Sequence, residues 1–256
     1  MNMLLKNKNI LIMGVANKWS IAWGIATACH NAGANLIFTY QNSRFENSIR
    51  ALTKDMPGVR LYPCDVTNDD EIVGLFQSIE KDGGELHGLV HSLAFAKKEE
   101  LQGSYYETSR EGYLLAQNIS AYSLVAVTRH AKPLMKNGGS IITMTYLGGE
   151  RVVPNYNVMG VAKSALESSV RYLAVDLGPE NIRVNAISAG PIKTVSASGV
   201  KNFSSMLKHY EEKNPMRRTV TTEEIGNTAM FLLSDLASGI TGETIHVDGG
   251  YHILGI

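Results

Sequence analysis

Short apolar runs alternate with longer amphipathic segments along nearly the whole chain. Short runs that are apolar throughout are typical of parallel strands, and apolar residues three and four positions apart are typical of helices that cover a sheet. The runs predict strands at residues 9–13, 34–40, 59–63, 86–91, 140–145, 182–187 and 244–247. The amphipathic segments predict helices at residues 20–31, 68–81, 108–135, 156–177 and 221–233.

This alternation predicts an α/β protein with a Rossmann-like, doubly wound sheet of seven parallel strands and helices on both faces. The chain contains no linker, low-complexity tract or internal repeat, so we expect a single domain over residues 1–256. Ligands in such folds bind beyond the carboxyl ends of the strands, near the point where the strand order reverses. The segments that follow the strands are therefore the candidates for function.

The segment at residues 193–218 departs from this alternation. It contains no clear strand and only one short amphipathic stretch, at residues 203–212. A segment of this length inside a compact domain is usually a lid or binding loop, and a surface insertion is the alternative. We predict a substrate-binding lid at residues 193–218.

The composition is that of an ordinary globular protein, with 44% hydrophobic and 19% charged residues. The 24 basic and 24 acidic residues balance and form no long run of one sign, so neither a nucleic acid nor a membrane surface is an expected partner. No run of about 18 apolar residues predicts a membrane span. The two cysteines, Cys29 and Cys64, lie in no metal-ligand spacing, which favours reduced, buried thiols in a cytoplasmic protein without a metal site.

The seven-residue step from Tyr156 to Lys163 brings both side chains onto one face of the predicted helix. Seven residues turn through roughly 700°, about 20° short of two turns, and rise by about 10 Å. A phenol can donate a proton to a developing oxyanion. An ammonium can hold the hydroxyls of a bound cofactor and favour phenolate character through its charge. On their own, such residues can also share a helix face without any function.

The segment after the first strand, residues 14–24, lacks the GxGxxG fingerprint of dinucleotide sites. Gly14 permits a tight turn, and Ala16 is small enough for a phosphate to approach. A helix that begins at Ser20 and Ile21 offers free N–H groups to an anion. The segment is therefore a candidate phosphate site, although a glycine after a strand is commonly only a turn.

Gln41 follows the second strand, where a dinucleotide site usually carries an acidic residue for the adenine ribose. Arg44 can favour a 2′-phosphate there, or it can be an exposed residue of the next helix. Asp65, which precedes Val66 after the third strand, can accept from an adenine amino group or cap the helix at residues 68–81. The neutral Gln41 favours NADH over NADPH.

Small and apolar residues follow the fourth strand, among them Ser92, Leu93 and Ala96, and they suit close contact with a ribose or an acyl chain. After the sixth strand, the turn at residues 190–191 can lay backbone groups along a nicotinamide amide. The candidate cofactor contacts continue through Ile192, Lys193, Thr194, Val195 and Ser196.

Taken in order, these motifs resemble the divergent branch of the short-chain dehydrogenase/reductase superfamily, and more narrowly its bacterial enoyl-acyl-carrier-protein reductases. The matching residues are Gly14 with the gap to Ser20-Ile21, Cys64-Asp65-Val66, Tyr146-Leu147-Gly148, Tyr156 to Lys163, Arg183 to Ile192, and Gly242 to Gly250. Ordinary short-chain reductases have Tyr and Lys four residues apart and a Ser thirteen residues before the Tyr. Here the step is seven and the earlier position is Thr143, which argues against a ketone or alcohol enzyme.

The resemblance implies NADH-dependent reduction of the trans-2 double bond of enoyl thioesters carried by acyl carrier protein. Tyr156 would hydrogen-bond the enolate oxygen, and Lys163 would anchor the nicotinamide ribose. Tyr146 would orient the substrate or take part in its protonation, and Ala96 would contact it. Residues 193–218 match the substrate-binding loop of the family, whose members are usually homotetramers. The alternatives are a carbonyl reductase or hydroxysteroid-type dehydrogenase, and a nucleotide-sensing protein without catalysis, which would typically have lost the Tyr or the Lys.

Overall fold

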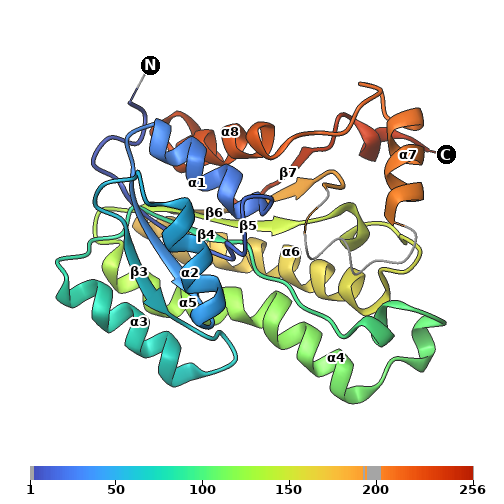
Figure 1. Cartoon of the computed structure of the whole chain (residues 1–256), viewed down its shortest axis with the longest axis horizontal. Coiled ribbons are helices and arrows are strands. Elements are labelled where there is room, and N and C mark those ends of the chain that lie inside the picture. Colours follow the sequence, from blue (N-terminus) through green and yellow to red (C-terminus); the bar gives the residue numbers. More distant parts are fainter. Residues whose placement is uncertain (1–2, 193, 195–202, 256) are drawn as a thin grey trace.

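The computed structural model describes residues 3–192, 194 and 203–255. In that part of the chain seven parallel strands form one sheet, in the order β3-β2-β1-β4-β5-β6-β7 (Figure 1). The strands are β1 (Asn9–Met13), β2 (Asn35–Tyr40), β3 (Arg60–Pro63), β4 (Gly88–His91), β5 (Gly139–Thr145), β6 (Ile182–Ala189) and β7 (Thr244–Val247). Strand order reverses between β1 and β4. The predicted Rossmann-like, doubly wound sheet is confirmed.

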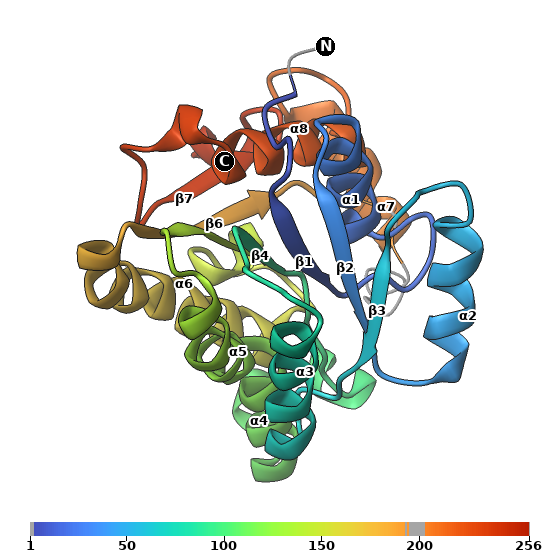
Figure 2. The same ribbon diagram turned by 90° about the vertical axis from the view of Figure 1, so that its left-hand side faces the viewer.

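Helices cover both faces of the sheet (Figure 2). One face carries α1 (Ile21–Asn31), α2 (Ser43–Leu52) and α8 (Thr222–Leu233), and the other carries α3 (Asp69–Lys81), α4 (Arg110–Gln117), α5 (Ser123–Ala131) and α6 (Asn157–Leu177). The helix α7 (Phe203–Lys213) lies beside the C-terminal end of the chain (Figure 1). None of the helices in the described ranges has the length and apolar character that a membrane span needs.

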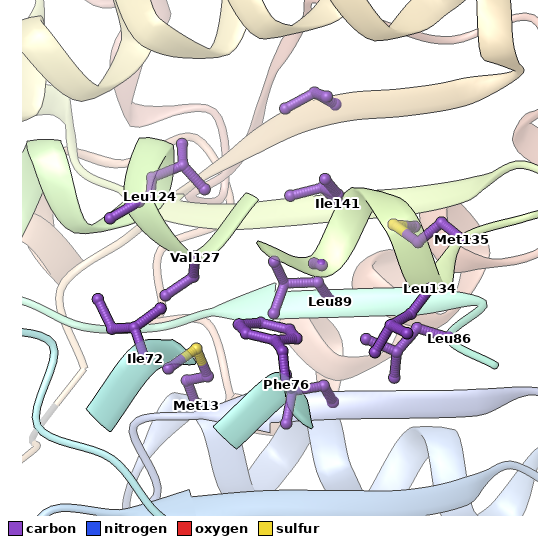
Figure 3. Close-up of a cluster of buried hydrophobic side chains, with 14 of the residues drawn as sticks. Met13, Ile72, Phe76, Leu86, Leu89, Leu124, Val127, Leu134, Met135 and Ile141 are labelled. Carbon is purple, nitrogen blue, oxygen red and sulfur yellow. The ribbon is translucent and has the colours of Figure 1, made fainter. Parts of the chain in front are cut away.

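Two apolar clusters enclose the sheet, because its central strands bury both of their faces. In β1, Leu11 and Met13 belong to the cluster under α3, α5 and α6, whereas Ile10 and Ile12 belong to the cluster under α1 and α8. This division follows from the two-residue period of a strand. The first cluster is shown in Figure 3, where side chains from the sheet interdigitate with those of α3 and α5.

The predicted helix at residues 108–135 is divided in the structure. A π-helical turn at Asn118–Tyr122 separates α4 from α5, and a 3-10 turn at Lys132–Leu134 follows α5. Within the π turn, the hydroxyl of Ser120 accepts a hydrogen bond from Phe95 N and donates one to Phe95 O. The division therefore ties this helical stretch to the loop that follows β4.

The apolar pattern gave no bounds for α2, and the reason is that this helix buries only Ile49. Its start is set instead by Asn42, whose side chain accepts hydrogen bonds from the N–H groups of Arg44 and Phe45. The helix that carries Lys163 begins at Asn157, so Tyr156 immediately precedes its first residue.

Candidate active site

A cavity of about 730 Å³ lies at the carboxyl ends of the strands, on the loops that follow β1 to β6. Its volume is within the range of about 300–1,000 Å³ for small-molecule sites. It spans the position between β1 and β4 at which doubly wound folds bind ligands. The π turn, α6 and α7 contribute Ile119, Met159 and Met206 to its wall.

The loop after β1 packs directly on the loop after β4, and Gly14 makes this contact possible. Its φ of +100° lies in the region that favours glycine, and an added Cβ would lie 2.0 Å from the carbonyl oxygen of Ser92. Gly14 and Ser92 both line the cavity, so a ligand there would meet backbone rather than side chains. This cradle fits the close backbone approach that a dinucleotide requires.

Ser20 acts within the loop rather than on the cavity wall. Its Oγ accepts hydrogen bonds from the N–H groups of Ala16 and Asn17, at 3.0 and 3.1 Å. Neither Ser20 nor Ile21 lines the cavity. The geometry therefore assigns Ser20 to shaping the loop, because its hydroxyl accepts from two loop N–H groups that precede α1.

At the other end of the cavity, Gln41 and Asp65 form one polar unit. Gln41 Nε2 donates to Asp65 Oδ2 at 2.8 Å, and Thr67 donates to Asp65 Oδ1 through both its N–H and its hydroxyl. Burial raises the pKa of Asp65, but these hydrogen bonds outweigh it and hold the pKa below its ordinary value. Asp65 does not cap α3, because Asn68 accepts from Asp70 N there.

Two tyrosines stand at the end of the cavity near β5. Tyr146 follows β5 directly, and its ring meets that of Tyr156 edge-on, with centroids 5.1 Å apart and planes at 72°. Burial raises the pKa of Tyr146 to about 12 and raises the pKa of Tyr156 still further. Both phenols therefore keep their protons at neutral pH and can donate hydrogen bonds.

Lys163 of α6 is buried, with only 5% of its surface exposed. Its Nζ donates to the carbonyl oxygen of Met144 at 2.8 Å. Burial lowers the pKa of Lys163 to about 8, and the carboxylate of Glu167 opposes that shift. The ammonium lies outside the cavity wall itself.

His91 and Thr143 form a second polar group that faces the protein interior. His91 Nδ1 lies 2.9 Å from Thr143 Oγ1, and its Nε2 lies 2.7 Å from Ser123 Oγ. Both His91 and Thr143 are fully buried, and neither lines the cavity. Burial, with the nearby charge of Lys163, lowers the pKa of His91 to about 3, so the ring is neutral.

The structure brings most of the predicted site residues to one cavity. Those that line it are Gly14, Gln41, Asp65, Val66, Ser92, Leu93, Ala96, Tyr146, Tyr156 and Ile192. Ser20, Ile21, Lys163 and Thr194 do not line it. Lys193, Val195 and Ser196 lie outside the described residues.

Several lining residues were missed from the sequence. Met159 stands three residues after Tyr156, in the first turn of the helix that Tyr156 precedes, and helical spacing alone would have found it. Leu101, Val153 and Met206 come from three separate segments, and no local pattern connects them. They are apolar and add aliphatic surface to the cavity wall, which suits an aliphatic group of a ligand.

A doubly wound sheet, a cavity at its reversal point and a Tyr–Lys helix beside it define a dinucleotide-binding oxidoreductase of the short-chain dehydrogenase/reductase class. The sequence profile of the family described as enoyl-(acyl carrier protein) reductase matches residues 14–252. The chain belongs to this family.

Known relatives are similar over their whole length. The enoyl-acyl-carrier-protein reductase (NADH) FabI of Bacillus cereus is 60% identical over 254 residues, which cover 98% of this chain and 99% of the relative. The enoyl-acyl-carrier-protein reductase (NADPH) FabI of Staphylococcus aureus is 55% identical, with 98% of each chain covered. A crystal structure of the Bacillus cereus reductase with NADP+ and indole naphthyridinone matches with a TM-score of 0.98 at 59% identity, and covers 100% of both chains.

Replacing the buried ammonium should stabilise the fold. The pKa of Lys163 falls from 10.5 to about 8, which corresponds to about 3 kcal/mol at neutral pH. Loss of the hydrogen bond to Met144 offsets about 1 kcal/mol of this stabilisation. We expect Lys163→Met to raise the free energy of unfolding at pH 7 by about 1–2 kcal/mol, as measured by denaturant titration.

The pH dependence of this stability difference follows from the linkage between protonation and folding. Because the folded pKa lies below the unfolded one, the cost of the charged lysine is fully present below about pH 8 and disappears as the pH rises towards 10.5. The advantage of Lys163→Met should therefore shrink between those values. Lys81→Met, at an exposed lysine of α3, is the control and should change stability by less than about 0.5 kcal/mol. A destabilised Lys163→Met variant would contradict the assigned cost.

Proposed function

We propose that this protein reduces the trans-2 carbon–carbon double bond of enoyl thioesters on acyl carrier protein, with NADH as the reductant, in type II fatty acid synthesis. The observation that carries this proposal is the protonated Tyr156 phenol in the cavity wall, with Tyr146 edge-on beside it and the buried Lys163 seven residues further along the chain. Membership of the enoyl-(acyl carrier protein) reductase family supports the same reaction.

The cofactor, when bound, supplies a hydride to C3 of the enoyl group, so that negative charge develops on the thioester oxygen. Tyr156 donates a hydrogen bond to that oxygen, and the donation strengthens as the charge grows. Lys163 keeps a positive charge in this part of the protein and would hold a ribose hydroxyl of the cofactor. Its ammonium has three N–H donors, of which the bond to Met144 uses one. Tyr146, which keeps its own proton, fixes the ring of Tyr156.

Two positions favour this reaction over the reduction of a ketone. Thr143, thirteen residues before Tyr156, directs its hydroxyl to His91 inside the protein and does not reach the cavity. Met159, four residues before Lys163, lines the cavity with a thioether, which has no proton to donate. Of these positions on and beside α6, Tyr156 is therefore the one that can donate a hydrogen bond to a substrate carbonyl.

The polar end of the cavity supports NADH as the cofactor. The Asp65 carboxylate lines the cavity beside Gln41, and its hydrogen bonds keep it ionised at neutral pH. A 2′-phosphate placed there would meet a negative charge, whereas a ribose hydroxyl could donate to it. Arg44 is exposed and does not line the cavity.

A homotetramer is the proposed assembly. Tyr172 and Val175 lie three residues apart on α6 and are 74% and 76% exposed. Leu114 on α4 and Tyr122 in the π turn add exposed apolar surface to the same layer of helices. Large apolar side chains exposed on one layer of helices favour burial between copies. Light scattering should give about four times the chain mass of 27.9 kDa, and a monomer mass would contradict the proposal.

The function is tested by following the absorbance of NADH with crotonyl-coenzyme A as the enoyl thioester. We expect oxidation of NADH that depends on the enoyl substrate, and slower oxidation when NADPH replaces NADH. Acetoacetyl-coenzyme A, a ketoacyl thioester, is the matched control and should give no turnover. Turnover of the ketone without turnover of the enoyl substrate would overturn the proposal.

Tyr156→Phe removes the hydroxyl and keeps the ring against Tyr146. Loss of one donor to a developing oxyanion typically costs about 100-fold or more in rate. We expect kcat to fall by roughly that factor while the Kd of NADH, measured by fluorescence, stays within about threefold of wild type. An unchanged kcat would show that another group stabilises the oxyanion.

A further inference from the structure

The end of β5 holds two charged side chains of α6 through consecutive residues. The carbonyl oxygen of Met144 accepts from Lys163 Nζ at 2.8 Å, and Thr145 Oγ1 donates to Glu167 Oε1 at 2.5 Å. Lys163 and Glu167 are four residues apart and therefore lie on one face of the helix. One strand end thus fixes both an ammonium and a carboxyl group.

Glu167 is enclosed as closely as Lys163. It is 6% exposed, and a Cβ added to Gly149 would lie 2.5 Å from its Oε1. A carboxylate removed from water costs free energy unless it is paired or hydrogen-bonded. Helix α6 has exposed positions on which a glutamate would cost nothing, so this burial needs a reason.

The charged groups around Glu167 come from several elements. Lys163 and Arg171 lie on its own helix, one turn to either side, and Glu150 lies in the loop after β5. Burial raises the pKa of Glu167, and Glu150 adds to that effect. The hydrogen bond from Thr145 and the two cations oppose this rise without cancelling it, so the pKa of Glu167 stays above its ordinary value.

Lys163 faces Glu167 on α6 and His91 on β4. The pKa of His91 is lowered to about 3 by burial and by the charge of Lys163, so this imidazole brings no competing positive charge. Glu167 is the one carboxylate that acts on Lys163 within the described residues.

We propose that Glu167 is a positioning residue whose carboxylate, fixed on β5 by Thr145, keeps the Lys163 ammonium charged at the end of β5. This role rests on the function proposed above. No direct ion pair joins Lys163 to Glu167 among the described side chains. The carboxylate acts across a low-dielectric interior, where charges interact strongly beyond contact distance. The ammonium therefore stays free to bond Met144 and a ribose hydroxyl.

The test compares pH profiles of kcat/KM for wild type and Glu167→Gln between about pH 6 and 10. Glutamine keeps the size of the side chain and an oxygen that accepts from Thr145, and it removes the charge. In the wild type kcat/KM should fall above about pH 8, where Lys163 loses its proton. In Glu167→Gln that fall should begin roughly one pH unit lower, while the values near pH 6 stay within about twofold.

Two further variants keep the test decisive. Thr145→Val removes the hydroxyl that favours the ionised carboxylate of Glu167. It should therefore shift the pH profile in the same direction by a smaller amount. If Glu167→Gln fails to fold, the profile of Thr145→Val tests the role of Glu167 in its place. Glu150→Gln is the matched control. It removes a neighbouring carboxylate that faces His246, at 2.9 Å, and should not move the profile to lower pH.

The Kd of NADH, measured by fluorescence over the same pH range, gives a readout without turnover. It should weaken at a lower pH in Glu167→Gln than in wild type. A uniform loss at every pH, or an unmoved profile in an active variant, would overturn the role of Glu167 and leave the proposed function intact. A wild type that binds NADH but does not reduce crotonyl-coenzyme A would overturn the proposed function instead, and the NADH titrations would still report on Glu167.

Discussion

The burial of one ammonium group at the carboxyl end of β5 is the constraint on which the rest of the site depends. Lys163 can stay charged there only if the backbone supplies an acceptor, which is the carbonyl oxygen of Met144. Met144 belongs to the carboxyl end of β5, where the ladder with β6 pairs it with Ile187. The strand and α6 must therefore keep one fixed relative position, and the apolar cluster between them maintains it.

The same strand end also determines where the phenols stand. Tyr146 follows β5 without an intervening residue, and Gly148 leaves room for Tyr156, because an added Cβ would lie 2.4 Å from the Tyr156 ring. On the far side of the reversal point, Gly14 plays a comparable part by letting the β1 loop touch the β4 loop. Small residues next to strand ends thus shape the cavity, and larger residues fill its wall.

The sequence predicted the fold well because the apolar residues of most strands and helices follow the spacing that is typical of that element. The π turn was not predicted, because it is tied to a distant segment by the hydrogen bonds between Ser120 and Phe95. Helix α2 was not predicted, because it buries a single residue. Within the site, residues that follow strands were found. Leu101, Val153 and Met206 were not, because only the tertiary fold brings them together. Ser20 follows β1 as predicted, and its hydroxyl accepts from two N–H groups of the loop instead of lining the cavity.

Glu167 shows what spacing alone can and cannot reveal. Its place four residues after Lys163 is visible in the sequence, but a pair at that distance on an exposed helix contributes little to stability or function. Burial changes this, because the low dielectric that makes Lys163 costly to charge also strengthens the effect of a nearby carboxylate. Burial therefore makes the charge of Lys163 depend strongly on the groups around it. A reaction that develops negative charge near the ammonium is stabilised more strongly for the same reason.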